Sequence, residues 1–203
     1  MWAKQKGFTI VELLIVIVVI AILAAITVVA FNGVQVRAEN AKTVSAVRAY
    51  EKALRQYALE NSAYPATGAM CLGEEYDVLN GTTAGCRQSN SVIANTANAA
   101  SRNNLRPYLS GNLPMPSKKI LVRESDGLGF VGIYLYGTGY NYTHNGDPVV
   151  ALWYTIEDST CPVGPVYSTA GSPNFTGDPV ARTLNRAANI SGCMMLLPDA
   201  SKL

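Results

Sequence analysis

The stretch that decides the fold is KQKGFTIVELLIVIVVIAILAAITVVAF, residues 4–31. Two lysines precede an apolar run over residues 8–31, which only three residues interrupt: Thr9, Glu12 and Thr27. About 20 apolar residues are enough for an α-helix to cross the hydrocarbon core of a bilayer. The run therefore predicts one hydrophobic membrane-spanning helix over residues 8–31.

Glu12 is the residue that a simple membrane anchor does not explain. A carboxylate costs on the order of 2.5–3.5 kcal/mol at the centre of a bilayer on insertion scales, and less near the end of a span. A chain that needed only an anchor would carry an apolar residue at this position. Glu12 should therefore have a partner.

Three simpler interpretations compete for the same residues. A secretory signal peptide has an apolar region of about 7–15 residues and a small-residue cleavage site. The run here is longer and ends in Val28-Val29-Ala30-Phe31, which is a poor site. A plain single-pass anchor explains the length and the lysines but not Glu12. The buried core helix of a soluble protein is the third alternative.

The segment resembles the N-terminus of type IV prepilins and their pseudopilin relatives. The matching residues are Lys6, Gly7, Phe8, Thr9, Ile10, Val11 and Glu12, followed by the aliphatic run. The resemblance implies a leader peptide of residues 1–7, cleaved by a prepilin peptidase between Gly7 and Phe8, with methylation of the new amine of Phe8. It also implies that Glu12 docks the subunit into a helical filament by neutralising an N-terminal amine. Many pilins carry a proline just after the aliphatic run, and Val28-Val29-Ala30 has none.

A function follows from this resemblance as an expectation. The chain would be a structural, non-enzymatic subunit of a type IV pilus-like filament, without a cofactor. It would wait in the inner membrane as a single-pass protein with its C-terminal domain outside, and then enter an extracellular filament. Its partners would be the prepilin peptidase, other pilin subunits and an inner-membrane assembly platform.

Other functions remain open at this point. One is a pseudopilin of a type II secretion or competence machine. Another is a minor pilin that acts as an adhesin or DNA-binding module. A third is an exported domain that is anchored but never polymerises. The sequence does not choose among adhesion, motility and competence as the end use.

The charge balance argues against nucleic acid as the partner of a filament subunit. The chain has 16 Lys+Arg and 14 Asp+Glu, a net charge of +2. Removal of Lys4 and Lys6 with the leader leaves 16 − 2 = 14 basic residues against 14 acidic residues. A neutral chain has no electrostatic footprint for a polyanion. The basic residues before the apolar run instead favour an N-terminus on the cytoplasmic side.

Four cysteines lie beyond the apolar run: Cys71, Cys86, Cys161 and Cys193. An even number of cysteines in an exported domain predicts two disulfides. Four cysteines allow three connectivities, and we favour Cys71–Cys86 with Cys161–Cys193 because each pair brackets a stretch rich in Gly, Ser, Asn and Pro. A zinc site is the competing use, but no C-x₂-C pair is present.

The remaining sequence predicts an α+β fold, in which a long N-terminal helix packs on a small antiparallel sheet with disulfide-tied loops. Residues 32–61 continue the helix as an amphipathic segment, with Val44, Val47, Leu54 and Tyr57 on one stripe. The helix is expected to run from Phe8 to Asn61, with Asn32-Gly33 as the natural place for a bend. Residues 62–117 form the variable connection, in which Asn95–Leu109 is either a short helix or an Asn-rich loop.

Residues 118–203 contain the sheet and a C-terminal disulfide-bounded region. Period-two alternation predicts strands over Lys119–Arg123, Gly129–Tyr136 and Val149–Ile156. The segment between Cys161 and Cys193 is expected to be a loop with one short helix, Val180–Ala188. Met194–Leu197 is expected to be a last edge strand.

No catalytic or metal site emerges from the sequence. His144 is the only histidine and lies in a predicted turn, without a second histidine or a cysteine placed to share a metal. Acidic residues show no calcium-loop spacing. Gly137-Thr138-Gly139 lacks the lysine and the following helix of a phosphate loop.

Overall fold

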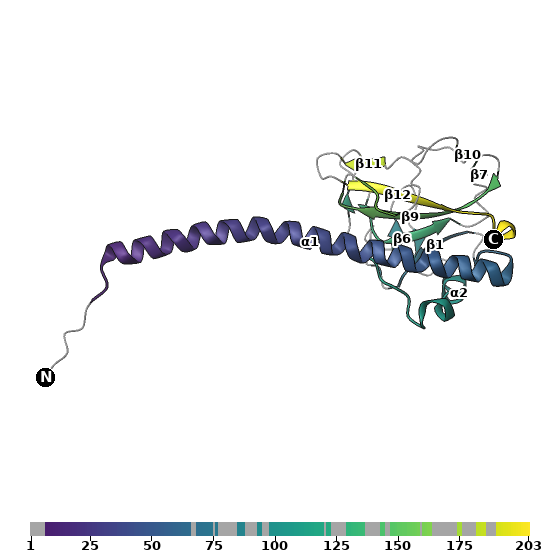
Figure 1. Ribbon diagram of the computed structural model, residues 1–203, viewed down its shortest axis with the longest axis horizontal. Helices are drawn as coiled ribbons and strands as arrows, with labels where there is room; N and C mark the ends of the chain where they lie inside the picture. The colour runs from purple at the N-terminus through teal and green to yellow at the C-terminus, as the bar shows by residue number, and fades with distance from the viewer. Residues whose placement is uncertain are drawn as a thin grey trace. The chain divides into compact units, whose positions relative to one another are not determined.

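The computed structural model describes residues 7–65, 68–74, 76, 85–87, 93–94, 98–119, 121–122, 129–136, 143–144, 147–158, 160–163, 174–175, 182–185 and 190–203. The chain divides into two compact units, Met1–Ala38 and Glu39–Leu203. Helix α1 (Ile10–Asn61) contributes residues to both units (Figure 1). The predicted α+β class, with a long N-terminal helix and a small antiparallel sheet, is confirmed.

Helix α1 begins two residues later than the sequence predicts and ends where predicted. Its residues include no proline, and helical structure continues through Asn32-Gly33, where the sequence favours a bend. The helix ends at Asn61, and Ser62 follows in the left-handed region with φ 54°. A left-handed residue after the last turn is a common way to end a helix. Pro65 then keeps Tyr64 out of the helical region.

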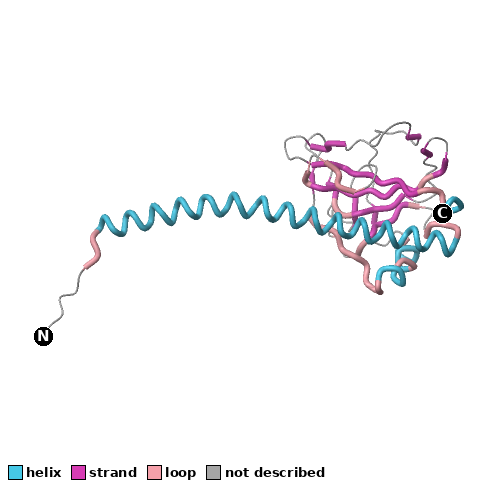
Figure 2. Tube along the Cα trace, viewed as in Figure 1, coloured by secondary structure: helices cyan, strands magenta, loops and turns pink. Residues whose placement is uncertain are grey.

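Five strands form the main sheet of the second unit, in the spatial order β1-β6-β9-β12-β11 (Figure 2). Every neighbouring pair is antiparallel. The bounds are β1 Ala69–Leu72, β6 Ile133–Tyr136, β9 Val150–Ile156, β12 Ile190–Leu197 and β11 Arg182–Asn185. Strand β9 lies at the centre, and Leu152 pairs with Leu135 on one side and Met195 on the other.

The main core lies between one face of this sheet and the part of α1 that belongs to the second unit. Val47, Tyr50 and Leu54 on α1 are fully buried, and Val44 and Tyr57 are partly buried at the margin. The four residues that the sequence placed on one stripe therefore all contact the core. The sheet contributes alternate residues to the same core: Met70, Leu72, Ile133, Leu135, Val150, Leu152, Tyr154, Ile156, Cys193, Met195 and Leu197.

A second apolar cluster covers the other face of the sheet. It contains both sulfurs of the Cys71–Cys86 disulfide, together with Tyr134, Ala151 and Met194. The rings of Tyr134 and Trp153 stack at 6.2 Å between centroids. Both faces of the sheet are therefore packed, which explains why β9 is buried at nearly every position.

Short strands form two further sheets. One has the order β3-β2-β5-β4, built from β3 (Ile93–Ala94), β2 (Gly85–Arg87), β5 (Gly129–Phe130) and β4 (Leu121–Val122). The other has the order β10-β7-β8, built from β10 (Asn174–Phe175), β7 (Thr143–His144) and β8 (Asp147–Pro148). The β10–β7 pair is parallel. His144 was expected in a turn, but its backbone lies in β7 opposite Asp147.

The predicted strand Gly129–Tyr136 is wrong as a single element. The structure splits it at Gly132, which has φ +71° and separates β5 from β6. The Tyr76 ring occupies the space beside this glycine, where a Cβ would lie 2.2 Å from a ring carbon. The Tyr76 hydroxyl donates to the Leu72 carbonyl at 2.6 Å and accepts from the Ile133 N–H at 3.1 Å. Alternation continues across the break, so the pattern did not reveal it.

Three predictions for the C-terminal region are also wrong. Val180–Ala188 was expected to be a helix, but Arg182–Asn185 is strand β11. The expected edge strand Met194–Leu197 is part of the longer β12, which lies inside the sheet between β9 and β11. The segment between Cys161 and Cys193 was expected to be a loop, but it contains β10, β11 and the start of β12. Pairing with β12, rather than local propensity, decides β11.

The connecting region contains the short helix that was one of two alternatives. Helix α2 (Ala99–Asn103) is followed by the 3₁₀ helix η1 (Arg106–Leu109), while Asn95–Ala97 lies outside the described residues. The segment after η1 packs on α1. There the Tyr50 hydroxyl donates to the Pro114 carbonyl at 2.9 Å, and the Ser117 N–H donates to Thr43 Oγ1 at 3.1 Å. The chain ends in the 3₁₀ helix η3 (Ala200–Lys202).

Two disulfides hold the second unit. Cys71 in β1 is bonded to Cys86 in β2, with 5.5 Å between the Cα atoms. Cys161 is bonded to Cys193 in β12, with 5.8 Å between the Cα atoms. These are the two pairs that the loop composition favoured, and they leave no free cysteine in the part of the chain that the structure describes.

Candidate functional site: the N-terminal apolar helix

The first unit presents an apolar helix whose described side chains are exposed. Phe8 is 77% exposed, and large apolar side chains from Ile10 to Val34 are exposed to a comparable degree. Helix α1 is long and apolar enough to cross a membrane, and none of its most apolar window is buried inside the protein. Contiguous apolar surface of this extent marks a site that contacts lipid or protein.

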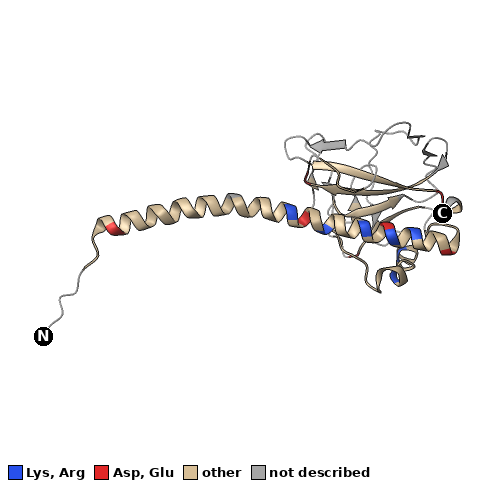
Figure 3. Cartoon of the chain, in the orientation of Figure 1, with Lys and Arg blue, Asp and Glu red and all other residues tan. Residues whose placement is uncertain are grey.

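Charge is absent from most of this surface. Figure 3 shows an acidic position near the start of α1. In the sequence, the only acidic residue there is Glu12, and the next charged residue along the helix is Arg37. No residue between them can form an ion pair. Any charge-specific contact in the apolar segment must therefore involve Glu12 or the N-terminus itself.

Glu12 closes a hydrogen-bonded ring with Thr9 at the start of α1. Glu12 Oε2 accepts from the Thr9 N–H at 2.8 Å and from the Thr9 hydroxyl at 2.8 Å. The Glu12 N–H donates to Thr9 Oγ1 at 3.2 Å. This is a capping box, in which two orphan N–H groups at a helix start are satisfied reciprocally. The carboxylate also complements the positive end of the helix dipole.

Glu12 was predicted as a site residue, but Thr9 was not predicted as its hydrogen-bond partner. The signal was available, because Thr-x-x-Glu immediately before an apolar run is the sequence pattern of a capping box. Glu12 therefore has a partner within its own chain, Thr9, three residues before it.

The expected cleavage position lies directly before the helix. Gly7 and Phe8 are exposed, non-helical residues, and among the described residues other than its chain neighbour none has an atom within 4 Å of a Cβ placed on Gly7. Gly7, Phe8, Thr9 and Glu12 therefore form one short segment at the start of α1. The leader residues 1–6 lie outside the described residues.

The cysteines belong to a different part of the chain. All four lie in the Glu39–Leu203 unit, where Cys71, Cys86 and Cys193 are fully buried and Cys161 is partly buried. The described residues contain no group of three or more His, Cys, Asp or Glu side chains placed to hold a metal. A cavity of about 10 Å³, lined by Asn40, Thr43, Thr155 and Glu157 among others, has room for no more than one water molecule.

Buried tyrosines of the second unit have perturbed titration for structural reasons. Burial raises the pKa of Tyr64 and of Tyr154 to about 12, and raises the pKa of Tyr50 and Tyr76 further. Each hydroxyl donates to a backbone carbonyl, for example Tyr64 to Pro198 at 2.8 Å and Tyr154 to Val163 at 3.2 Å. These phenols tie connecting segments to the core as neutral donors, so they are unsuited to acid–base chemistry near neutral pH.

Comparison with known proteins found matches that involve the N-terminal segment. A family model described as the prokaryotic N-terminal methylation motif matches residues 2–28. Type II secretion system core protein G of Escherichia coli is 44% identical over 64 residues, which are 32% of this chain and 44% of that protein. The Vibrio cholerae protein of the same name is 42% identical over 64 residues, 32% of this chain and 44% of that protein.

A pilin is also similar over a longer stretch. Type IV major pilin protein PilE1 of Neisseria gonorrhoeae is 29% identical over 101 residues, 49% of this chain and 56% of that protein. The chain spans less than half the length of the secretion proteins it matches. No solved structure matches the chain. By their names, these relatives are secretion-system core proteins and a major pilin. Over its N-terminal region the chain therefore carries the prokaryotic N-terminal methylation motif and is similar to type II secretion system core protein G and to a type IV major pilin.

Proposed function

We propose that the chain is the structural subunit of a type IV pilus-like filament, which is cleaved after Gly7, methylated on Phe8 and polymerised through the apolar part of α1. The observation that carries the proposal is an entirely exposed apolar helix with a single carboxylate in its first turn. An exposed helix of this kind needs lipid before assembly and like helices afterwards.

The region around Gly7 supports processing there. A protease needs an accessible, non-helical backbone, and α1 begins only at Ile10. Because a Cβ at Gly7 would meet open space among the described residues, packing against them gives no reason for a glycine here. A glycine that serves recognition by a prepilin peptidase accounts for it.

Cleavage would create a new charge next to Glu12. The amine of Phe8 would be the neighbour of the Thr9 N–H, which already donates to the Glu12 carboxylate at 2.8 Å. A cation and a carboxylate in hydrocarbon stabilise each other far more than in water. In the filament, Glu12 would exchange part of its capping box for the amine of a neighbouring subunit, and the apolar helices would pack around that pair.

The topology follows from the charges and the disulfides. The lysines before the apolar run favour a cytoplasmic N-terminus. Disulfides form and persist in oxidising compartments, so the two disulfides of the second unit support a position of Glu39–Leu203 outside the cytoplasmic membrane. The subunit would therefore wait as a single-pass membrane protein, meet an assembly platform there, and leave as part of an extracellular filament.

Variants at Glu12 and Thr9 separate the capping role from the charge role. Glu12→Gln keeps the capping box, because Gln is equally suited to the third helical position, but removes the charge. Thr9→Val removes the hydroxyl of the box and keeps the charge. We expect Glu12→Gln to abolish filament assembly with cleavage intact, and Thr9→Val to assemble at a reduced level.

The measurement is the mass of the N-terminal peptide from sheared filaments and from membranes. A peptide that starts at Phe8 and carries one extra methyl group in the sheared fraction is the expected result for the unmodified chain. A chain that still starts at Met1 and stays in the membrane would refute the proposal. Normal assembly by Glu12→Gln would refute the role of the charge.

A pseudopilin is the second candidate, and the similarity to type II secretion system core protein G favours it. That similarity covers 64 residues, so it bears mainly on the apolar helix and its continuation. Deletion of the gene distinguishes the two candidates. Loss of surface filaments with normal export of secreted proteins supports the pilin, and the reverse result supports the pseudopilin.

A further inference from the structure

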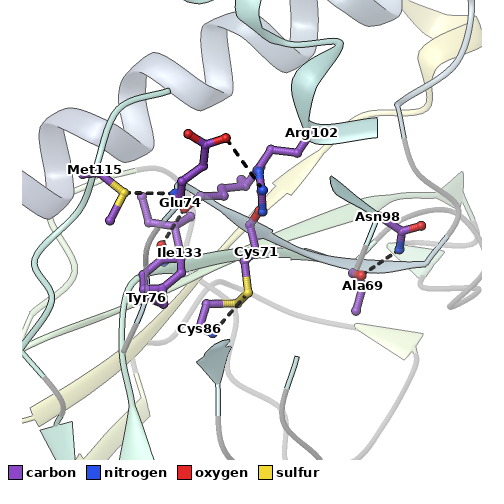
Figure 4. The surroundings of a disulfide bond; sticks show 10 residues. Ala69, Cys71, Glu74, Tyr76, Cys86, Asn98, Arg102, Met115 and Ile133 are labelled. Carbon is purple, nitrogen blue, oxygen red and sulfur yellow. Dashed lines mark hydrogen bonds and ion pairs between the residues drawn. A yellow bond between two sulfur atoms is a disulfide. The ribbon is translucent and has the colours of Figure 1, made fainter. Parts of the chain in front are cut away.

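Strand β1 is the edge of the main sheet, and its outer side is capped by side chains. It pairs with β6 on one side and is the first strand in the sheet order. Asn98 Nδ2 donates to the Ala69 carbonyl at 2.8 Å, and Arg102 Nη1 donates to the Cys71 carbonyl at 3.4 Å (Figure 4). Carbonyls two residues apart on a strand point to the same edge. The two side chains therefore bond to successive outward carbonyls.

The spacing of the two donors matches the spacing of the two acceptors. Asn98 and Arg102 lie one turn apart at α2, and the Arg102 N–H donates to the Asn98 carbonyl at 3.0 Å. Four residues of helix rise about 6 Å, and two residues of strand advance about 6.6 Å. A single helical turn laid along β1 therefore places one donor at each outward carbonyl.

The Asn98 side chain forms a hydrogen bond to strand β1 and none to the first turn of its own helix. It is the N-cap residue of α2, where an Asn side chain ordinarily accepts from the first turn, yet it makes no side-chain cap bond. Its backbone is left-handed, with φ 53° and ψ 32°. A Cβ on Gly68 would lie 3.1 Å from Asn98 Nδ2, so the residue before β1 leaves room for the amide.

Arg102 is held at the edge by a charge network. It is 5% exposed, and its Nη2 lies 3.9 Å from Glu74 Oε1. Arg106 donates to the same carboxylate oxygen at 2.6 Å. Burial of a charged guanidinium is costly, and here the buried charge reaches a strand edge that water would otherwise solvate.

We infer that Asn98 and Arg102, by occupying the outward carbonyls of β1, prevent this edge from pairing antiparallel with β1 of a second copy of this chain. Open sheet edges pair readily with other chains. The inference rests on the proposed function only for its consequence: in a filament, tethered domains meet at an effective concentration in the millimolar range. Edge pairing would then compete with packing of the apolar helices.

The experiment uses the purified full chain in detergent micelles and measures protein mass by light scattering across a concentration series. The test variant Asn98→Asp/Arg102→Met removes both donors, and Asp tolerates the left-handed backbone of Asn98. We expect self-association at least tenfold tighter than in the unmodified chain. Arg106→Met is the matched control, because it removes an arginine from the same network and leaves both donors; it should behave as the unmodified chain does.

A third variant identifies the surface that associates. Ala69→Pro, added to the test variant, removes an outward N–H from β1 without touching its ladder with β6, and should restore the unmodified mass. An unchanged mass for the test variant, equal association by Arg106→Met, or no effect of Ala69→Pro would each overturn the inference. If circular dichroism shows that the double variant is unfolded, the protein mass of the single variant Asn98→Asp is compared with that of the unmodified chain instead. Unchanged mass for this variant would likewise overturn the inference. Neither processing nor filament formation enters the measurement, so it can fail while the proposed function stands.

Discussion

Helix α1 joins two stretches that differ in apolar content, in charge and in how far their side chains are buried. Between Ile10 and Val34 the large apolar side chains are exposed, whereas Val47, Tyr50 and Leu54 are fully buried. No charge interrupts the first stretch after Glu12, while charged residues recur along the second (Figure 3). A continuous apolar run without charge therefore distinguishes the exposed stretch from the amphipathic stretch that packs on its own sheet.

Substitution of two glycines by alanine should give the largest difference in the free energy of unfolding. Gly132→Ala places a Cβ against the Tyr76 ring at φ +71°, so we expect the free energy of unfolding to fall by about 4 kcal/mol or more. Gly33→Ala adds a methyl group in open space within α1 and should not lower it. Denaturant unfolding of the full chain in detergent measures both, and equal losses would contradict the contrast.

Truncation of leucines should give the next largest effect. Leu54→Ala removes a fully buried side chain from the core and should cost about 2–5 kcal/mol of unfolding free energy. Leu23→Ala removes a side chain that is 56% exposed in the first unit and should change that quantity by less than about 0.5 kcal/mol. Thermal unfolding of the second unit, followed by near-ultraviolet circular dichroism, compares them. A loss from Leu23→Ala as large as that from Leu54→Ala would show that the two stretches are not energetically separate.

Alkaline pH should destabilise the second unit alone. Burial raises the pKa of Tyr154 from 10.0 to about 12, so between pH 10 and 12 the unfolded state loses a proton that the folded state keeps. Stability is complete below pH 10 and falls as pH rises through this window, by at most about 1.4 kcal/mol per pH unit for each such phenol. Tyr154→Phe should flatten the fall, which unfolding curves at pH 9, 10 and 11 will show. A slope equal to that of the unmodified chain would mean that the phenol titrates normally in the fold.

The smallest effect is expected at the end of α1. Ser62 has φ 54°, a conformation that glycine adopts without strain. Ser62→Gly should raise the free energy of unfolding by about 0.5–1 kcal/mol, detectable as a higher midpoint in thermal unfolding. Ser45→Gly, inside the same helix at an exposed position, is the control and should lower the midpoint. A lower unfolding midpoint for both variants would show that the left-handed backbone of Ser62 is not a source of strain.

Most of the fold's first third was predictable from local sequence. The apolar run, the continuation of the helix and the stop before Pro65 depend on hydropathy, propensity and proline stereochemistry, which act over a few residues. Glu12 was predictable as a site residue because a carboxylate in an apolar run is costly wherever it lies. The Thr9 partner was equally local and was missed.

The sheet was predictable only in part. Val150–Ile156 is a strand because β-branched and aromatic residues alternate there, and this was evident from the sequence. The break at Gly132 depends on Tyr76, which lies 56 residues earlier in the chain. Strand β11 exists because β12 offers it an edge, and its own residues resemble those of a short helix. Such pairings are set by contacts between distant segments, so no local pattern contains them.

The sequence by itself determined the apolar helix and its single carboxylate, because the free energy of moving apolar and charged side chains between water and lipid depends on local groups. Tertiary structure alone decided the order of the strands, the division at Gly132 and the capping of the β1 edge by Asn98 and Arg102. These features require groups from distant parts of the chain to meet at hydrogen-bond distance, and only the packed fold brings them there.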